Sequence, residues 1–208
     1  LHRRRHSFPT RRSSDLVSVG DTLSLINTAH TLKFSSTTYS NSVPSSPVFS
    51  ESALEAAELL AANNIYSNFG EQRVLDFNTI FCANNPTTIN AIKRLITSSA
   101  QPASGISSGV VNVYNGAYRL VVLKYLASNA LGQYDSTKKN WWGIAAVNSV
   151  PQRSWQAYLG IWEAPNLKVP QEGSNAEDVH NDNWYYNTRG AYGICALSGK
   201  GIIMSQAA

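Results

Sequence analysis

The end of the chain, from Glu172 to Ser205, constrains the fold most, because turn residues, aromatic side chains and β-prone runs follow one another there. A polar turn precedes the aromatic run 184–186, and residues 188–197 form a second β-prone segment. Residues 198–201 then turn the chain into the apolar run 202–204. The pattern predicts two or three long antiparallel strands at the end of the chain, and it favours a structural role over a catalytic one.

Two helices have signatures upstream of these strands. Ser50 is expected to cap a helix that runs through about Ala62, and Asn85 followed by Pro86 is expected to begin a second helix. Their apolar stripes are expected at Leu54, Ala57, Leu60 and Ala61 and at Ile89, Ile92 and Ile96.

Further strands are expected between and after the helices. The pair Asn115-Gly116 between two β-prone runs predicts a hairpin over 110–126. Single strands are predicted at 74–83, 141–147 and 155–163.

The remaining segments are predicted to be extended or irregular. Residues 23–50 are expected to cross the surface with one short strand near 31–34, and residues 164–180, which contain Pro165, are expected to form a long connection. Strands and helices do not alternate regularly enough for a doubly wound sheet. The predicted class is therefore α+β.

The amino end stands apart from the rest of the sequence. Residues 6–16 look like a translated sequencing adapter, and the alternative is a basic targeting segment, although no apolar core follows the arginines as in a secretory signal. Residues 1–16 are interpreted as an artefactual or disordered head. Without them the chain has 12 Lys+Arg and 12 Asp+Glu, so the sequence pI of about 9.1 does not indicate nucleic-acid binding.

The two cysteines, Cys82 and Cys195, each lie in a β-prone run flanked by apolar residues. Buried free thiols are expected, because two isolated cysteines favour neither a disulfide nor a metal site. No apolar run approaches eighteen or so residues, so no membrane span is expected. We predict a soluble protein without a cofactor.

Two patterns resemble catalytic or metal sites. Residues 105–109 match the G-x-S-x-G string of serine hydrolases, but a loop precedes Ser107 and a β-prone run follows it, so a chance match is favoured and no catalytic residue is predicted. His30 stands alone in a polar loop. A carboxylate-histidine group in and beside this connection could form a metal cluster or an acid-base pair, but it is interpreted as a solvated loop, with a bridging calcium or magnesium ion left open: Glu163, Glu177, Asp178, His180 and Asp182.

Aromatic side chains offer an alternative function. A glycan- or peptide-binding module of β type uses such side chains as rigid anchors, whereas tryptophans in strands more often belong to a core or a subunit contact. The residues concerned are Trp141, Trp142, Trp155, Trp162 and the run 184–186.

Several segments resemble one known family when taken in order. The carboxyl end has Trp-x-Tyr at 184–186, Arg-Gly-x-Tyr-Gly-Ile at 189–194 and Gly-Lys-Gly-Ile-Ile-Met-Ser at 199–205, and residues 21–30, 52–58 and 85–95 add a loop and two helices. Together, from about residue 20 to the end, they resemble major capsid proteins of tailed bacteriophages, whose fold is named after phage Hong Kong 97.

The resemblance implies a Hong Kong 97-like phage capsid fold in truncated form, without the amino arm, the extended loop and most of the spine helix. It implies an extended loop segment at 17–49, a helix and strand of the peripheral lobe at 50–85, an axial-lobe-like region at 86–154, and antiparallel strands of the peripheral lobe at 155–208.

The implied function is that of a structural major head subunit, not an enzyme, that self-assembles into an icosahedral shell around the DNA genome. Its implied locations are the virion and, during assembly, the host cytoplasm. The implied partners are other copies in pentamers and hexamers, with scaffold, portal or decoration proteins, DNA by non-specific proximity only, and no membrane. Residues expected at subunit contacts are Trp162, Glu163, Glu177, Asp178, Trp184, Tyr186 and Arg189, the last bonding a carboxylate of the adjoining copy.

Overall fold

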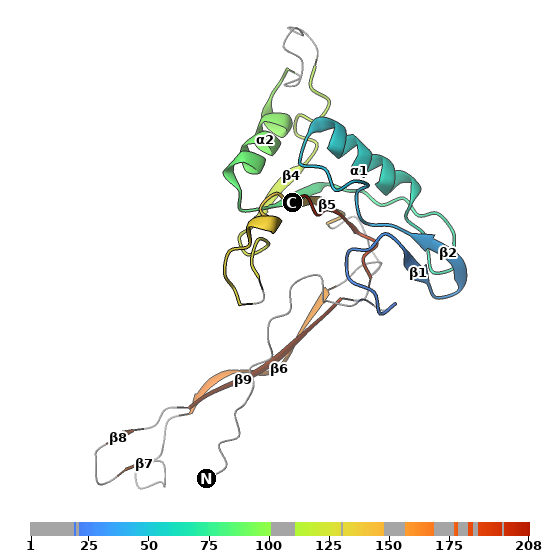
Figure 1. The fold of residues 1–208 in the computed structure, drawn as a ribbon. Coiled ribbons are helices and arrows are strands. Elements are labelled where there is room, and N and C mark those ends of the chain that lie inside the picture. Colours follow the sequence, from blue (N-terminus) through green and yellow to red (C-terminus); the bar gives the residue numbers. More distant parts are fainter. Residues whose placement is uncertain are drawn as a thin grey trace. The chain divides into compact units, whose positions relative to one another are not determined.

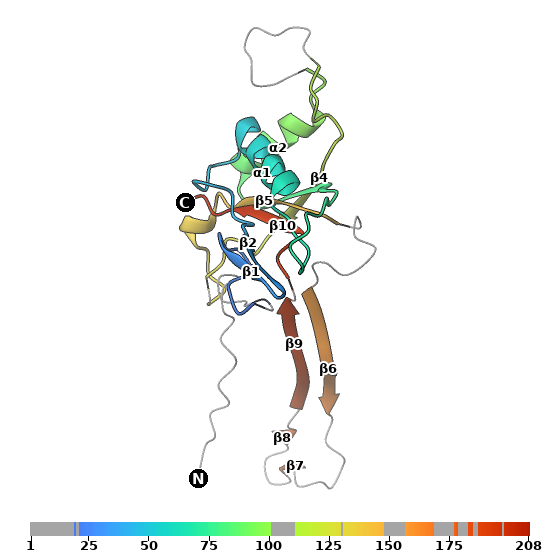
Figure 2. The same cartoon turned by 90° about the vertical axis from the view of Figure 1, so that its right-hand side faces the viewer.

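The computed structural model describes Val19 and residues 21–100, 111–129, 131–147, 157–168, 177–178, 183–184, 187–196 and 198–208. The chain divides into two compact units, which we call the core unit (Leu1–Gln156 with Ala196–Ala208) and the hairpin unit (Ala157–Cys195). The fold is mixed α+β, as the sequence predicts (Figure 1, Figure 2).

A four-stranded sheet in the order β10-β5-β3-β4 forms the centre of the core unit (Figure 1). Its strands are β3 (Thr79–Ala83), β4 (Arg119–Leu123), β5 (Trp142–Ala145) and β10 (Ile202–Ser205). β3 is parallel to β4 and antiparallel to β5, and β5 is antiparallel to β10. Every residue of β3 and β5 is buried, which confirms the two strands predicted here, although β3 begins later than expected and Val74 is exposed.

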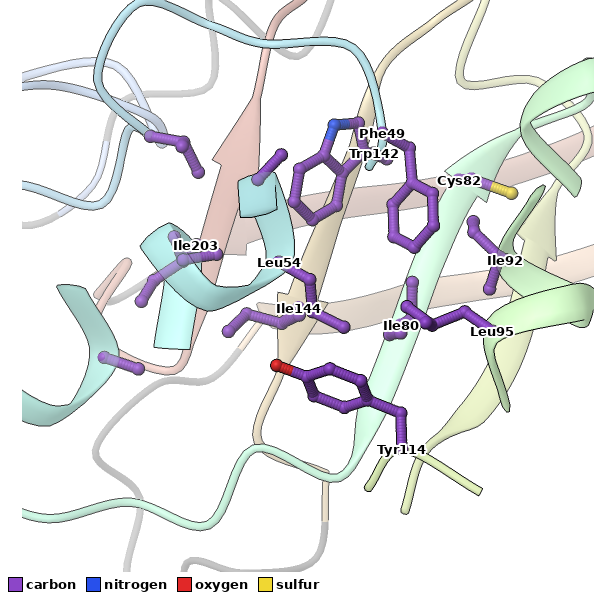
Figure 3. Packing of buried hydrophobic residues seen from close by; sticks show 14 of the residues in the cluster. Phe49, Leu54, Ile80, Cys82, Ile92, Leu95, Tyr114, Trp142, Ile144 and Ile203 are labelled. Carbon is purple, nitrogen blue, oxygen red and sulfur yellow. The ribbon is translucent and has the colours of Figure 1, made fainter. Parts of the chain in front are cut away.

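Alternation along the strands gives the sheet two apolar faces, because successive side chains of a strand point to opposite sides. Ile80, Ile144 and Ile203 lie side by side across three strands and pack with residues of both helices (Figure 3). Phe49 meets Trp142 edge to face, with ring centroids 5.0 Å apart (Figure 3). The opposite face carries a second, smaller cluster with Phe81, Trp141, Ala145 and Met204.

Both predicted helices are present with the predicted caps. Helix α1 spans Glu51–Asn63 and α2 spans Pro86–Thr97. The Ser50 hydroxyl accepts a hydrogen bond from the Ala53 amide at 3.2 Å, and the Asn85 side chain accepts one from the Thr87 amide at 3.1 Å. These caps satisfy amides that have no partner inside the helix. The helices bury Ala53, Leu54, Ala57 and Ala61 of α1, and Thr88, Ile92 and Leu95 of α2.

The hairpin predicted over 110–126 was wrong. Asn115 and Gly116 do lie in a turn, with Gly116 at a φ of 73°, but β4 after the turn pairs in parallel with β3. The segment before the turn is held by the end of α2, because the Asn112 amide group donates to the carbonyls of Leu95 and Ser98. The unit is therefore β3-α2-β4, a parallel crossover that local sequence does not distinguish from a hairpin.

Two strand pairings also differ from expectation. The predicted short strand is β1 (His30–Leu32), and it pairs antiparallel with β2 (Ser35–Tyr39), which was not predicted. The final strand was expected to belong with the long antiparallel strands that precede it. That expectation was wrong, because β10 pairs with β5 in the central sheet. Ile203 and Met204 are buried there, so the apolar ending fits the core rather than an exposed hairpin.

The hairpin unit contains two small sheets. Strand β6 (Ala157–Lys168) pairs with β9 (Asn187–Ala196), running in opposite directions in Figure 2, and β7 (Glu177–Asp178) pairs antiparallel with β8 (Asn183–Trp184). The long connection predicted from residue 164 begins later, since β6 continues through Pro165 to Lys168. Proline is tolerated because β6 pairs with a strand on one side only.

Candidate functional site

Exposed apolar side chains mark the hairpin unit as a candidate interaction surface. In β6, Trp162 is 93% exposed, and Ile161 and Leu167 are also exposed; Tyr192 of β9 is 69% exposed. A two-stranded sheet is only marginally stable in water by itself. Apolar side chains exposed on such a sheet make it a candidate for contact with another molecule.

The subunit-contact residues predicted from the sequence fall on this unit. Trp162 and Glu163 are neighbours in β6, and Arg189 lies in β9. The structure brings Glu177 of β7 opposite Trp184 of β8, with Asp178 opposite Asn183. Tyr186 lies outside the described residues.

A buried polar cluster surrounds His30, which was predicted to stand alone in a polar loop. His30 lies in β1 and is fully buried. Its Nδ1 atom is 2.8 Å from Oδ2 of Asp21, and its Nε2 atom is 3.2 Å from Oδ1 of Asn41. The ring stacks on Tyr39 with centroids 4.8 Å apart. Asp21 and Asn41 are nine and eleven residues away in sequence, so no local pattern predicts the contact.

Asn41 connects this cluster to the carboxyl end of the chain. Its amide nitrogen donates to the carbonyls of Leu25 at 2.7 Å and Gly199 at 3.1 Å, and its oxygen accepts from the Asn27 amide at 2.8 Å. These three bonds fix which end of the amide faces His30. Both ring nitrogens of His30 therefore face acceptors, and the cluster holds chain segments together rather than presenting a base.

Neighbouring ionisable groups fit this structural role. Burial raises the pKa of Tyr39 to about 12, and hydrogen bonds to Ser198 and to the Gly199 backbone offset only part of the effect. Lys200 donates to the Asn68 side chain at 2.7 Å, and burial lowers the pKa of Lys200.

A second polar contact joins α1 to the segment before β4. The Glu58 carboxylate accepts hydrogen bonds from the hydroxyl groups of Tyr114, at 3.3 Å, and Tyr118. Burial, together with this carboxylate, raises the pKa of both tyrosines above the ordinary range. The contact tethers the helix to the turn that precedes β4.

The patterns that resembled catalytic or metal sites have few described residues. The G-x-S-x-G motif at 105–109, His180 and Asp182 lie outside the described residues. Within the described ranges no group of three His, Cys, Asp or Glu side chains is placed to hold a metal ion. No described helix is long and apolar enough to cross a membrane.

The two cysteines lie in different strands. Cys82 is a free, fully buried thiol in β3, as expected, and burial raises its pKa to about 11. Cys195 lies in β9. A thiol that stays protonated inside an apolar cluster is a poor nucleophile and a poor metal ligand.

Comparison with known proteins found no matching family model, no matching curated protein and no matching solved structure.

Proposed function

We propose that this chain is a structural subunit that assembles with copies of itself, and that the assembly is the capsid of a tailed bacteriophage. The observation that carries the proposal is the set of exposed apolar side chains on the two-stranded hairpin unit, with Trp162 almost fully exposed. The sequence resemblance to major capsid proteins supplies the kind of assembly. In this proposal the chain has no catalytic role.

The energetics of the hairpin unit support assembly. An aromatic side chain of this size buries about 200 Å² when covered, and at about 25 cal/mol per Å² this contributes roughly 5 kcal/mol before the costs of association. A shell repeats each contact many times, so contacts of this strength are sufficient. The neutral charge of residues 17–208 limits repulsion between copies.

A glycan- or peptide-binding module is less well supported. Two of the tryptophans considered for its surface, Trp141 and Trp142, are 7% and 0% exposed and belong to the core. Exposed aromatic side chains still occur on the hairpin unit, and they suit either function. An experiment therefore has to distinguish capsid assembly from glycan or peptide binding.

The test is the solution state of the full gene product that contains this chain. Sedimentation velocity is expected to show uniform pentamers, hexamers or closed particles, and tryptophan fluorescence is expected not to change with added glycans or peptides. A monomer at all concentrations whose fluorescence responds to such a ligand would support the binding module and contradict the capsid proposal.

A further inference from the structure

Two exposed phenylalanine rings form a second aromatic surface, on the core unit. Phe34, in the turn between β1 and β2, and Phe69, in the loop after α1, stack with centroids 5.1 Å apart and planes 17° from parallel. They are 59% and 71% exposed. We call these two rings the aromatic platform.

The backbone beneath the aromatic platform is fixed by hydrogen bonds. The Phe34 amide donates to the Asn68 carbonyl at 3.1 Å, and the Ser67 hydroxyl accepts from the Phe69 amide at 3.2 Å. Gly70 has a φ of 89°, which side-chain-bearing residues rarely adopt, and this closes the loop. The backbone that carries the stacked rings is therefore ordered without a ligand, so little backbone entropy is lost when another molecule covers them.

Charge distinguishes the surroundings of the platform from the hairpin unit. The Lys33 ammonium lies 5.3 Å from the centre of the Phe34 ring, and the exposed Glu71 and Arg73 follow Phe69, so these three neighbours leave one excess positive charge. Residues 157–195 contain five acidic and two basic side chains, a net charge of −3 with histidine neutral. The rest of the chain from residue 17 contains seven acidic and ten basic side chains, a net charge of +3. The two units are thus oppositely charged, and each carries exposed aromatic side chains.

We infer that the hairpin unit of one copy docks on the aromatic platform of a second copy, with Trp162 covering Phe34 and Phe69. This inference rests on the proposed function and identifies the surfaces that meet. Aromatic contact supplies the buried area, and the opposite charges favour the encounter and the orientation. Where each copy docks its hairpin unit on one neighbour and receives the hairpin unit of another, the contact is heterologous and builds rings or shells.

A photo-crosslinking experiment tests this contact directly. Trp162 is replaced by benzoylphenylalanine in the full gene product, and copies labelled with ¹⁵N are assembled with unlabelled copies that carry the same replacement. Trypsin cuts after Lys33 and Arg73, so a single peptide, 34–73, carries both platform rings, while position 162 lies in peptide 154–168. The expected products include crosslinks between these two peptides in which one peptide is ¹⁵N-labelled and the other is unlabelled, because the contact is between copies.

Other crosslinking outcomes would overturn the inference. A product in which both peptides always have the same isotope would mean that the hairpin unit reaches its own platform. Crosslinks to other peptides within assembled particles would mean that a different surface is covered, and the proposed function would stand. A gene product that never assembles would overturn the proposed function together with the inference.

Matched substitutions provide the second test. F34S combined with F69S is expected to raise the concentration needed for assembly by about tenfold or more, corresponding to about 1.4 kcal/mol or more per contact. The control is V113S combined with L131S, two similarly exposed apolar residues of the same unit. Equal effects of the two double variants would contradict a specific role for the platform, and circular dichroism checks that both variants are folded.

Discussion

Replacing Asn41 with alanine should destabilise the core unit more than any other exchange of a polar residue considered above. The side chain is 1% exposed and makes two bonds with its oxygen and two with its nitrogen. Alanine leaves four partners without their bond, and two of them, His30 Nε2 and the Gly199 carbonyl, are buried. A buried polar group without a partner costs about 1–3 kcal/mol, so the loss should be about 2–6 kcal/mol.

The loss should be measured by urea denaturation followed by tryptophan fluorescence, which reports the buried Trp142. With a slope of about 2 kcal/mol per M, the midpoint should fall by about 1–3 M. N115A is the matched control, because Asn115 is exposed and its loss should change stability by less than about 0.5 kcal/mol. Equal midpoints for N41A and N115A would refute the view that the His30 cluster holds residues 21–41 against the segment at Gly199.

Three further predictions concern buried groups of the core unit. The free energy of unfolding should fall as the pH rises from about 10 to about 12, because the pKa of Tyr39 is near 10.0 in the unfolded chain and about 12 in the fold. Urea denaturation at about pH 9 and about pH 11.5 measures this fall. An unchanged urea midpoint would argue against the burial of Tyr39. In a C195S variant, Cys82 should react with Ellman's reagent only after unfolding, and rapid reaction of the native protein would show that β3 is accessible. G143A should lower the thermal midpoint, because an added Cβ would overlap the Ile203 carbonyl on the neighbouring strand, and an unchanged midpoint would contradict the pairing of β5 with β10.

Local features of the fold were predictable from the sequence because their physical causes are local. Ser50 and Asn85 cap their helices through side-chain bonds to amides three and two residues away. The burial of β3 and β5 follows from short, nearly unbroken apolar runs. In each case the residues that determine the structure lie within one turn or one strand.

Partners distant in sequence could not be predicted in the same way. Asn115-Gly116 makes the expected turn, but the direction of β4 depends on the bonds from Asn112 to the end of α2. Asn41 meets Gly199 across 158 residues, so His30 resembled an isolated histidine. The candidate contact residues were predicted from the family resemblance, and of these Trp162 is exposed in the structure. The platform of Phe34 and Phe69 was missed because its two rings come from separate loops.

Negative-stain electron microscopy of the full gene product is the most direct test of capsid assembly. Closed shells, or uniform pentamers and hexamers, are expected without added ligand or enzyme. A monodisperse monomer that does not assemble at any concentration would refute the capsid proposal.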